Sequence, residues 1–265
     1  MERNVYPTEQ EILDRHQQLN RSAPADRIVI REGMEFIIDE DSRISIEHFC
    51  WRYYAGNVEL DHFLAKTMRR RRLLDVGSLH GVFSLVFAAR PGAQALAIEP
   101  SPVALKRLRT NCRLNPELDI RVVDCAAGAA EGVIPMRFEW EHLVAGGADA
   151  AKDMMIRVRS VDDILLDLRY APDVVKIDVE GYEKRVLDGM AKTLEHLRPD
   201  LHLECHGPLL LAAGDHPKDI FDILDRYGYR PMNIWTGEEV TYRDETYPNV
   251  WHLYCAPRER NWLRP

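Results

Sequence analysis

The chain has 265 residues, a formal net charge of −8 and a hydrophobic content of 46%. This length suits one large domain, or one domain with an extension, and the apolar content excludes a wholly disordered chain. The acidic balance argues against a nucleic-acid-binding scaffold, because contacts to phosphates need a basic face.

The sequence indicates neither a membrane protein nor a disulfide-stabilised one. No apolar run approaches the roughly 20 residues that span a bilayer, and residues 1–20 are polar and acidic, without a signal-peptide pattern. The five cysteines are scattered and include no CxxC pair, which predicts reduced thiols and no zinc cluster. We therefore expect a cytoplasmic protein with neither a nucleic-acid nor a membrane partner.

Residues 1–70 are predicted to form an N-terminal extension. A helix is expected within 1–27, a small hairpin over 28–38, and a second helix over 58–70, where apolar residues recur at helical spacing. This part carries no cofactor motif, so we expect it to pack over the mouth of a crevice as a lid.

Strands and helices alternate over the predicted domain, residues 71–258. Strands are predicted at 72–77, 93–100, 120–128, from 156, 172–181 and 200–207, and in the terminal segments RPMNIW and VWHLYCAP. Helices are predicted at 82–90, 102–116, before 167, 182–199 and 217–229, and a variable loop at 138–155. This alternation predicts an α/β fold with a mostly parallel sheet, and the last two strands predict an antiparallel hairpin at one edge. In such sheets, ligands bind at the carboxyl ends of the strands.

The first strand of this region leads into a glycine-containing turn, Asp75–Gly81, followed by a helix. Such a turn lets the backbone approach a ligand closely. Glu99 ends the next strand about 20 residues after Gly77, where a carboxylate can bind both hydroxyls of a ribose. The turn lacks the third glycine of the dinucleotide fingerprint, which argues against a pyrophosphate-containing cofactor.

A set of short motifs is more specific than the turn alone. They are Leu74–Gly77 with Gly81, Phe83 and Ser84; Ala97–Pro100; Val161–Leu165; Lys176–Glu183; and Leu203–His206. Together they resemble the FkbM family of S-adenosylmethionine-dependent methyltransferases, over about residues 70–210, and the KIDVEGYE segment is the most specific element. The resemblance implies a Rossmann-like class I methyltransferase fold, with a seven-stranded sheet and a reversed last strand. It also implies O-methylation of a hydroxyl on a sugar or small metabolite.

One motif departs from the family pattern. The glycine turn contains Leu79-His80 where the family usually has an Asn followed by a hydrophobic residue, so His80 is expected to face either the cofactor or the acceptor. The residues predicted to bind S-adenosylmethionine are Asp75, Gly77, Ser78, His80, Gly81, Glu99, Pro100, Asp124, Cys125 and Asp178.

Three polar residues that follow the fourth and fifth core strands are the predicted catalytic residues. They are Asp178, Glu204 and His206. An alcohol is a weak nucleophile, so His206 or Asp178 could act as a general base. The same three residues could instead hold Mg²⁺, although their spacing is no metal signature and we favour a metal-free site. Lys176 lies within an apolar strand, so we expect a structural ion pair with Asp178 or Glu204.

Two other classes of function remain open from the sequence. A nicotinamide-dependent oxidoreductase would use a similar fold, although the incomplete glycine pattern counts against it. A methyltransferase fold without catalytic activity would serve as a binding module. The expected partner in the leading interpretation is a small-molecule or glycan acceptor, and the sequence does not determine the oligomeric state.

Overall fold

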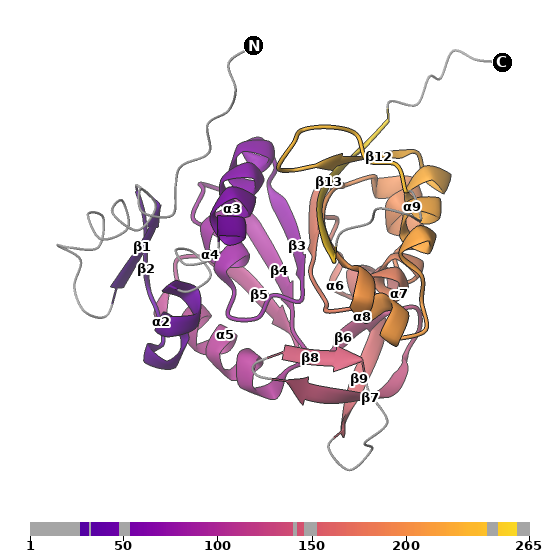
Figure 1. The fold of residues 1–265 in the computed structure, drawn as a ribbon. Helices are drawn as coiled ribbons and strands as arrows, with labels where there is room; N and C mark the ends of the chain where they lie inside the picture. The colour runs from indigo at the N-terminus through magenta and orange to yellow at the C-terminus, as the bar shows by residue number, and fades with distance from the viewer. Residues whose placement is uncertain are drawn as a thin grey trace.

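The computed structural model describes residues 27–31, 33–47, 54–139, 142–145, 153–242 and 249–258. The helix predicted within 1–27 therefore lies outside the described residues, apart from Arg27, which begins a strand. Figure 1 shows a central sheet with helices on both of its faces, and a smaller sheet beneath it.

The described part of the chain contains one large seven-stranded sheet, as predicted. In spatial order its strands are β12 (Tyr229–Asn233), β13 (Val250–Pro257), β11 (Asp200–His206), β10 (Val174–Ile177), β3 (Arg72–Val76), β4 (Gln94–Ile98) and β5 (Asp119–Val123). The strands from β11 to β5 run parallel, whereas β13 is antiparallel to both of its neighbours. The reversed last strand and the edge hairpin predicted from the sequence are thus confirmed, with β13 inserted between β11 and β12.

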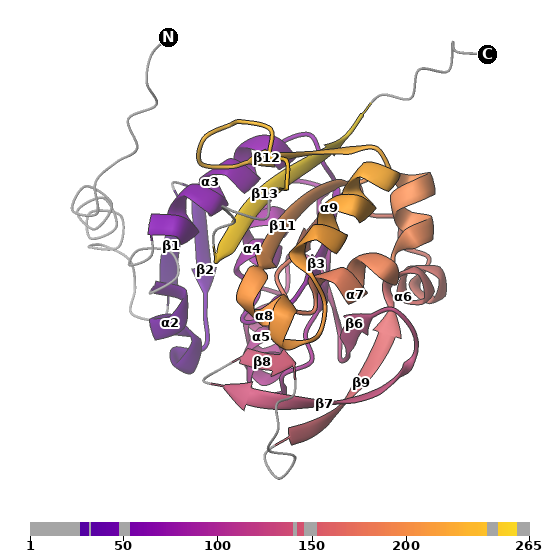
Figure 2. The same ribbon diagram turned by 45° about the vertical axis from the view of Figure 1, so that its right-hand side comes forward.

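Helices cover both faces of this sheet (Figure 2). On one face lie α3 (Tyr54–Thr67), α4 (Val82–Ala88) and α5 (Pro102–Leu114); on the other lie α6 (Val161–Leu168), α7 (Glu183–Asp188) and α9 (Pro217–Arg226). Successive strand residues point to opposite faces, so Leu74 packs beneath α6 and α7 while Leu73 packs towards α3 and α4. None of the described helices has the length and apolar character needed to cross a membrane.

The helix predicted over 182–199 is divided in the structure. α7 ends at Asp188, and a single π-helical turn, Thr193–Leu197, follows it. Gly189 lies at the break, where a Cβ atom would sit 1.8 Å from the carbonyl oxygen of Gly128. This close approach to Gly128 leaves no room for a side chain at the break.

The prediction of a loop over 138–155 is wrong, because all of its described residues belong to strands of a second sheet. This sheet has the order β6 (Ala126–Gly128), β9 (Asp153–Ser160), β7 (Gly132–Glu139) and β8 (His142–Ala145). The strand predicted over 120–128 breaks after Val123, and its second half joins this sheet. Val133 is 58% exposed and Met136 only 3% exposed. Because they are an odd number of residues apart, they point to opposite faces of the strand, of which only one is buried.

The described N-terminal residues pack into the same core as the large sheet. β1 (Arg27–Arg31) and β2 (Met34–Ile37) form the predicted hairpin, and α2 (Glu40–Glu47) follows it. Ile28 and Phe36 pack in one cluster with Phe63 of α3. The side chain of Asn115 bonds to both the amide (3.1 Å) and the carbonyl (2.7 Å) of Ile37. α3 is therefore part of the wall of the domain, and a lid role for the extension stays a prediction.

Candidate functional site

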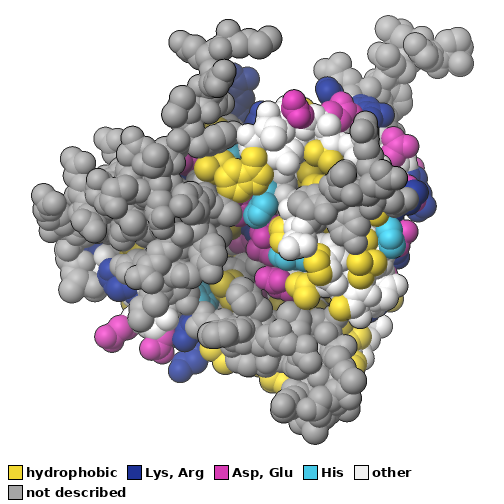
Figure 3. Space-filling model, viewed as in Figure 1, with side chains coloured by type: hydrophobic (Ala, Val, Ile, Leu, Met, Phe, Trp, Pro, Cys, Tyr) yellow, Lys and Arg dark blue, Asp and Glu magenta, His cyan; other side chains and the backbone are white. Residues whose placement is uncertain are grey.

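A hollow opens at the carboxyl ends of β3, β4 and β10, where the strand order of the large sheet changes direction. The open space within it amounts to about 610 Å³, including solvent-filled space at its mouth. Its lining residues are Val76, Gly77, Leu79, Ile98, Glu99, Pro100, Ala126, Ala127, Met136, Asp178, Val179, Glu180 and Tyr182. Figure 3 shows acidic and histidine side chains gathered in the hollowed centre of one face. This is the location expected for a ligand in an open α/β sheet.

The glycine turn brings two strand ends into direct contact at the floor of the hollow. Gly77 has a φ of 80°, and a Cβ atom there would lie 1.8 Å from the carbonyl oxygen of Asp178. Both the backbone conformation and the close approach therefore require glycine. The turn is tied to β4 through the amides of Gly77 and Ser78, which donate to the carbonyl of Ile98 at 2.9 and 3.2 Å.

Glu99 is held rigidly at the edge of the hollow. Its Oε2 accepts a hydrogen bond from the Leu79 amide (2.8 Å), and its Oε1 accepts one from the Ser101 amide (2.7 Å). Each oxygen retains a second lone pair, so the carboxylate can still bind two hydroxyl groups of a ligand. Burial raises the pKa of Glu99 to about 7, although the two amide bonds favour its ionised form.

Four of the ten predicted cofactor-binding residues line the hollow: Gly77, Glu99, Pro100 and Asp178. Asp75 and Ser78 are instead buried behind it, where Asp75 accepts a hydrogen bond from Ser84 (2.7 Å) and the Ser78 hydroxyl lies 3.3 Å from the carbonyl of Ile98. These two residues support the glycine turn from behind.

The other four predicted cofactor-binding residues also lie outside the lining of the hollow. Gly81 precedes α4 with a φ of 87°. His80 is buried against α5, with its Nε2 3.3 Å from a guanidinium nitrogen of Arg107. Asp124 is largely exposed and forms an ion pair with Arg109 at 3.2 Å. Cys125 is buried, which raises the pKa of its thiol to about 11.

Beside the hollow, a buried lysine connects three parts of the chain. Lys176 is 2% exposed, and its Nζ lies 3.1 Å from Asp178 Oδ2, 3.7 Å from Glu59 Oε1 and 4.5 Å from the ring centroid of Phe83. Burial disfavours the ammonium ion, but the surrounding carboxylates outweigh it and raise the pKa of Lys176. The predicted ion pair with Asp178 is confirmed, whereas the contribution of Glu59, from α3, was not predicted.

The structure brings Glu204 and His206 together and places several acids around His206. The Nδ1 atom of His206 is 2.7 Å from Glu183 Oε1, and its Nε2 is 3.5 Å from both Glu180 Oε2 and Glu204 Oε1. Burial disfavours the charged ring, but these acids outweigh it and raise the pKa of His206 to about 11. The raised pKa favours the charged form of His206, and a charged imidazole has no free lone pair with which to accept a proton from an alcohol.

The residues that sequence reasoning missed come mainly from outside the recognised motifs. Met136 belongs to the second sheet. Glu59 lies in α3 and His252 in β13, so one precedes the motifs in the chain and the other follows them. Ala126 and Ala127 could have been found, because they lie at the end of the predicted third strand, directly after Asp124 and Cys125.

Two groups of side chains contain the donor types that a divalent cation uses. They are Glu59, Glu204 and His252, and Asp178, Glu180 and His206; within each group the candidate atoms lie within 4.8 Å of one another. However, the Lys176 ammonium and the His206 imidazolium already place positive charge among these carboxylates. This arrangement favours a site that works without a metal ion.

Comparison with known proteins identifies one family. A family model described as the methyltransferase FkbM domain matches residues 75–231. The chain is 30% identical, over 156 residues, to hexuronic acid methyltransferase AglP of Haloferax volcanii; the match covers 57% of this chain and 60% of that protein. It is 26% identical over 156 residues to methyltransferase sdnD of Sordaria araneosa, covering 44% of this chain and 60% of that protein. The chain thus spans about 60% of the length of each curated relative.

Matches among solved structures have lower sequence identity. A methyltransferase FkbM from Methylobacillus flagellatus has 20% identity and a TM-score of 0.45, over 70% of this chain and 42% of that one. A TehB-like methyltransferase from Corynebacterium glutamicum has 14% identity and a TM-score of 0.45, over 82% and 98% of the respective chains.

Proposed function

Because the chain belongs to the FkbM family of S-adenosylmethionine-dependent methyltransferases, we propose that it methylates a hydroxyl oxygen on a sugar or another small metabolite. The observation that supports an oxygen acceptor best is the group of carboxylates and imidazoles beside the cofactor hollow. A hydroxyl nucleophile must lose its proton, and the carboxylates and the imidazole of His252 in this group provide acceptors for it.

The residues around the hollow fit S-adenosylmethionine. Glu99 is positioned to accept hydrogen bonds from the ribose hydroxyls, and Gly77 leaves the floor of the hollow free of a side chain. Ala126 and Ala127 offer a small apolar wall on which an adenine could rest. When bound, the cofactor supplies an electrophilic methyl group on a sulfonium ion.

The acceptor side of the site has the chemistry of a carbohydrate site. Asp178 and Glu180 line the hollow and can accept hydrogen bonds from several hydroxyl groups of one molecule. Trp235 lies beside His252, with their ring centroids 5.6 Å apart, and its indole is a surface on which a sugar ring can pack. The name of the archaeal relative specifies a hexuronic acid, which supports a sugar acceptor for this chain.

The proposal is tested by measuring binding and transfer separately. In titration calorimetry, S-adenosylmethionine should bind and NAD⁺ should not. The protein is then incubated with methyl-labelled S-adenosylmethionine and p-nitrophenyl glycosides, including the β-D-glucoside and the β-D-glucuronide. Label should appear in at least one glycoside. Binding of NAD⁺ without binding of S-adenosylmethionine would contradict the proposal.

We expect turnover to be independent of a divalent metal ion. Lys176 and His206 already place positive charge among the carboxylates beside the hollow, so positioning and proton transfer can drive the reaction without a metal. After dialysis against EDTA, the initial rate should stay within about twofold of the untreated rate. A parallel dialysis against the same buffer without EDTA serves as the control. If activity is lost only after EDTA and added Mg²⁺ restores it, a metal is required.

Several features complete the proposal and rest on the sequence. We propose that residues 71–258 form the catalytic domain, that residues 1–70 help to close the acceptor site, and that the protein acts in the cytoplasm on a small-molecule or glycan acceptor. The position of Glu59, which reaches from α3 to the buried Lys176, supports a role for the extension in the site.

A further inference from the structure

Two histidines beside the hollow have pKa values that are shifted in opposite directions. His206 is paired with Glu183, and its raised pKa favours the charged ring. His252, on β13, has a side chain that is 14% exposed, and burial lowers its pKa even though Glu204 and Asp178 oppose this effect. Its neutral imidazole is the form that can accept a proton. His252 also lies outside the residues matched by the family model, 75–231.

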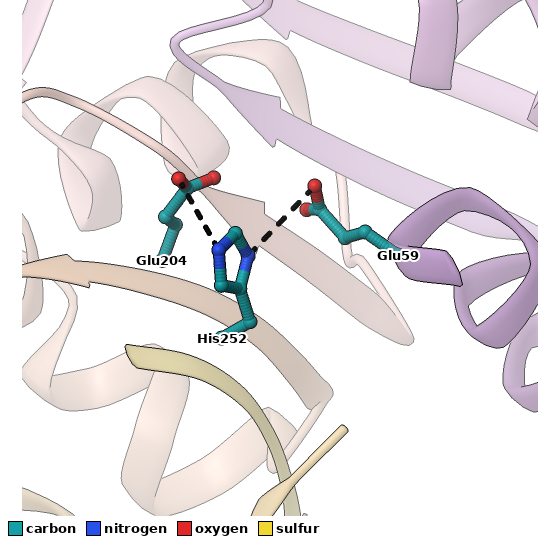
Figure 4. A group of neighbouring side chains, drawn as sticks. All are labelled: Glu59, Glu204 and His252. Atoms are coloured by element: carbon teal, nitrogen blue, oxygen red, sulfur yellow. Dashed lines mark ion pairs between the residues drawn. The ribbon is translucent and has the colours of Figure 1, made fainter. Parts of the chain in front are cut away.

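The imidazole of His252 lies between two carboxylates from different elements (Figure 4). Its Nδ1 faces Glu59 Oε2 at 4.0 Å, and its Nε2 faces Glu204 Oε1 at 3.8 Å. Among the described residues, the buried Nδ1 atom has no hydrogen-bond partner at these distances. Separations longer than a hydrogen bond are common in catalytic groups before the substrate binds.

The two ring nitrogens differ in their access to a ligand. Nδ1 is buried towards Glu59, whose side chain is 8% exposed, whereas Nε2 points towards Glu204, whose side chain is 17% exposed. Glu204 also lies 3.5 Å from His206, and His206 lies 3.5 Å from Glu180, which lines the hollow. These neighbouring side chains lead from the Nε2 side of His252 to Glu180 at the rim of the hollow, and a hydroxylated acceptor that lies along them would reach both.

We propose that His252 is the catalytic base of the methyl transfer, and that Glu59 and Glu204 orient and stabilise its ring. This inference rests on the proposed O-methylation. The acceptor oxygen loses its proton to Nε2 as it forms a bond to the methyl carbon. The electron pair of the broken carbon–sulfur bond stays on the departing sulfur, and Glu204 stabilises the imidazolium ion that results.

Glu59 sets the tautomer of the ring. In its ionised form it can accept a hydrogen bond from Nδ1–H, which leaves the lone pair of the neutral ring on Nε2. Burial, the largest effect, raises the pKa of Glu59 to about 8, with Lys176 opposing it and Glu204 and Asp178 adding to it. Ionisation of Glu59 should therefore increase turnover between pH 7 and pH 9, and Glu59→Gln should flatten this part of the profile.

The main test compares histidine variants in the glycoside assay. His252→Gln should lower kcat by about 10²–10⁴-fold and change the Kd for S-adenosylmethionine by less than about twofold. Added imidazole should partly restore the activity of His252→Ala. The control, His196→Gln, alters an exposed histidine outside the site and should leave kcat unchanged. A folded His252→Gln protein with kcat within about threefold of wild type would overturn the inference.

A second measurement does not depend on an acceptor. The histidine rings are labelled with ¹³C, and their NMR signals are followed from pH 5 to pH 9, with assignments from His252→Gln and His206→Gln. At pH 7 the His252 ring should be neutral and the His206 ring charged; the reverse would overturn the inference. A wild-type protein that binds S-adenosylmethionine but methylates only nitrogen or carbon acceptors would instead refute the proposed function.

Discussion

Replacing Glu99 with alanine should weaken the binding of S-adenosylmethionine by about 10²–10⁴-fold. The substitution removes two charge-assisted hydrogen bonds to the ribose, each worth about 1.5–3 kcal/mol, and 1.4 kcal/mol corresponds to a factor of ten. It also removes the acceptor that fixes the Leu79 and Ser101 amides at the rim of the hollow. Titration calorimetry with S-adenosylmethionine and S-adenosylhomocysteine measures the effect.

The same experiment has a control and a pH dependence. Glu117→Ala removes an exposed carboxylate that does not line the hollow, and it should leave the Kd unchanged. Because the pKa of Glu99 is raised to about 7, wild-type affinity should fall as the pH drops from 8 to 6, when the carboxylate takes up a proton. Glu99→Ala should lack this dependence. An unchanged Kd in a variant that melts at the wild-type temperature would show that Glu99 is not the ribose ligand.

Replacing Lys176 with methionine should destabilise the protein by about 3–5 kcal/mol. Removal of one partner from a buried ion pair leaves a charge that the interior cannot solvate. Methionine is similar in length and preserves the packing against Phe83, so the loss reports mainly the uncompensated charge of Asp178, joined by that of Glu59 where the pH exceeds its raised pKa. Urea unfolding at constant pH gives the free energy of unfolding of each variant.

Lys184→Met provides the matched control for this prediction. Lys184 forms a 2.7 Å ion pair with Asp188 at the protein surface, and its loss should cost no more than about 0.5 kcal/mol. The deficit of Lys176→Met should be larger at pH 9 than at pH 6. In the wild type, Glu59 ionises above its pKa of about 8 beside Lys176, whereas in the variant it must ionise without a cation. Equal stabilities for the two lysine variants would contradict the buried-charge interpretation.

The large sheet could be predicted because its signals are local. Its inner strands are continuous apolar runs, such as Leu73-Leu74 and Val174-Val175, and each is followed by a turn and a helix. The second sheet could not be placed in the same way. Its strands β7 and β9 pair with each other over most of their length and pack on a small cluster around Met136 and Val158. Such a sheet has only a weak apolar pattern of its own.

The candidate site was predicted where its residues follow strands of the motif. Gly77, Glu99 and Asp178 line the hollow for this reason. Glu59 and His252 could not be predicted, because their positions depend on how α3 and β13 pack against the middle of the sheet. His206 was correctly placed beside Glu204, but its protonation state depends on Glu180 and Glu183, whose positions only the fold reveals.

The most direct test of methyl transfer to a hydroxyl oxygen is to identify the bond that forms. The protein is incubated with S-adenosylmethionine carrying a ¹³C-methyl group and with the glycoside that accepts label, and the product is analysed by two-dimensional NMR. We predict a three-bond correlation from the methyl protons to a hydroxyl-bearing carbon of the sugar, which is the signature of a methyl ether. A correlation that places the methyl group on nitrogen or carbon, or as an ester on a carboxylate, would contradict this account.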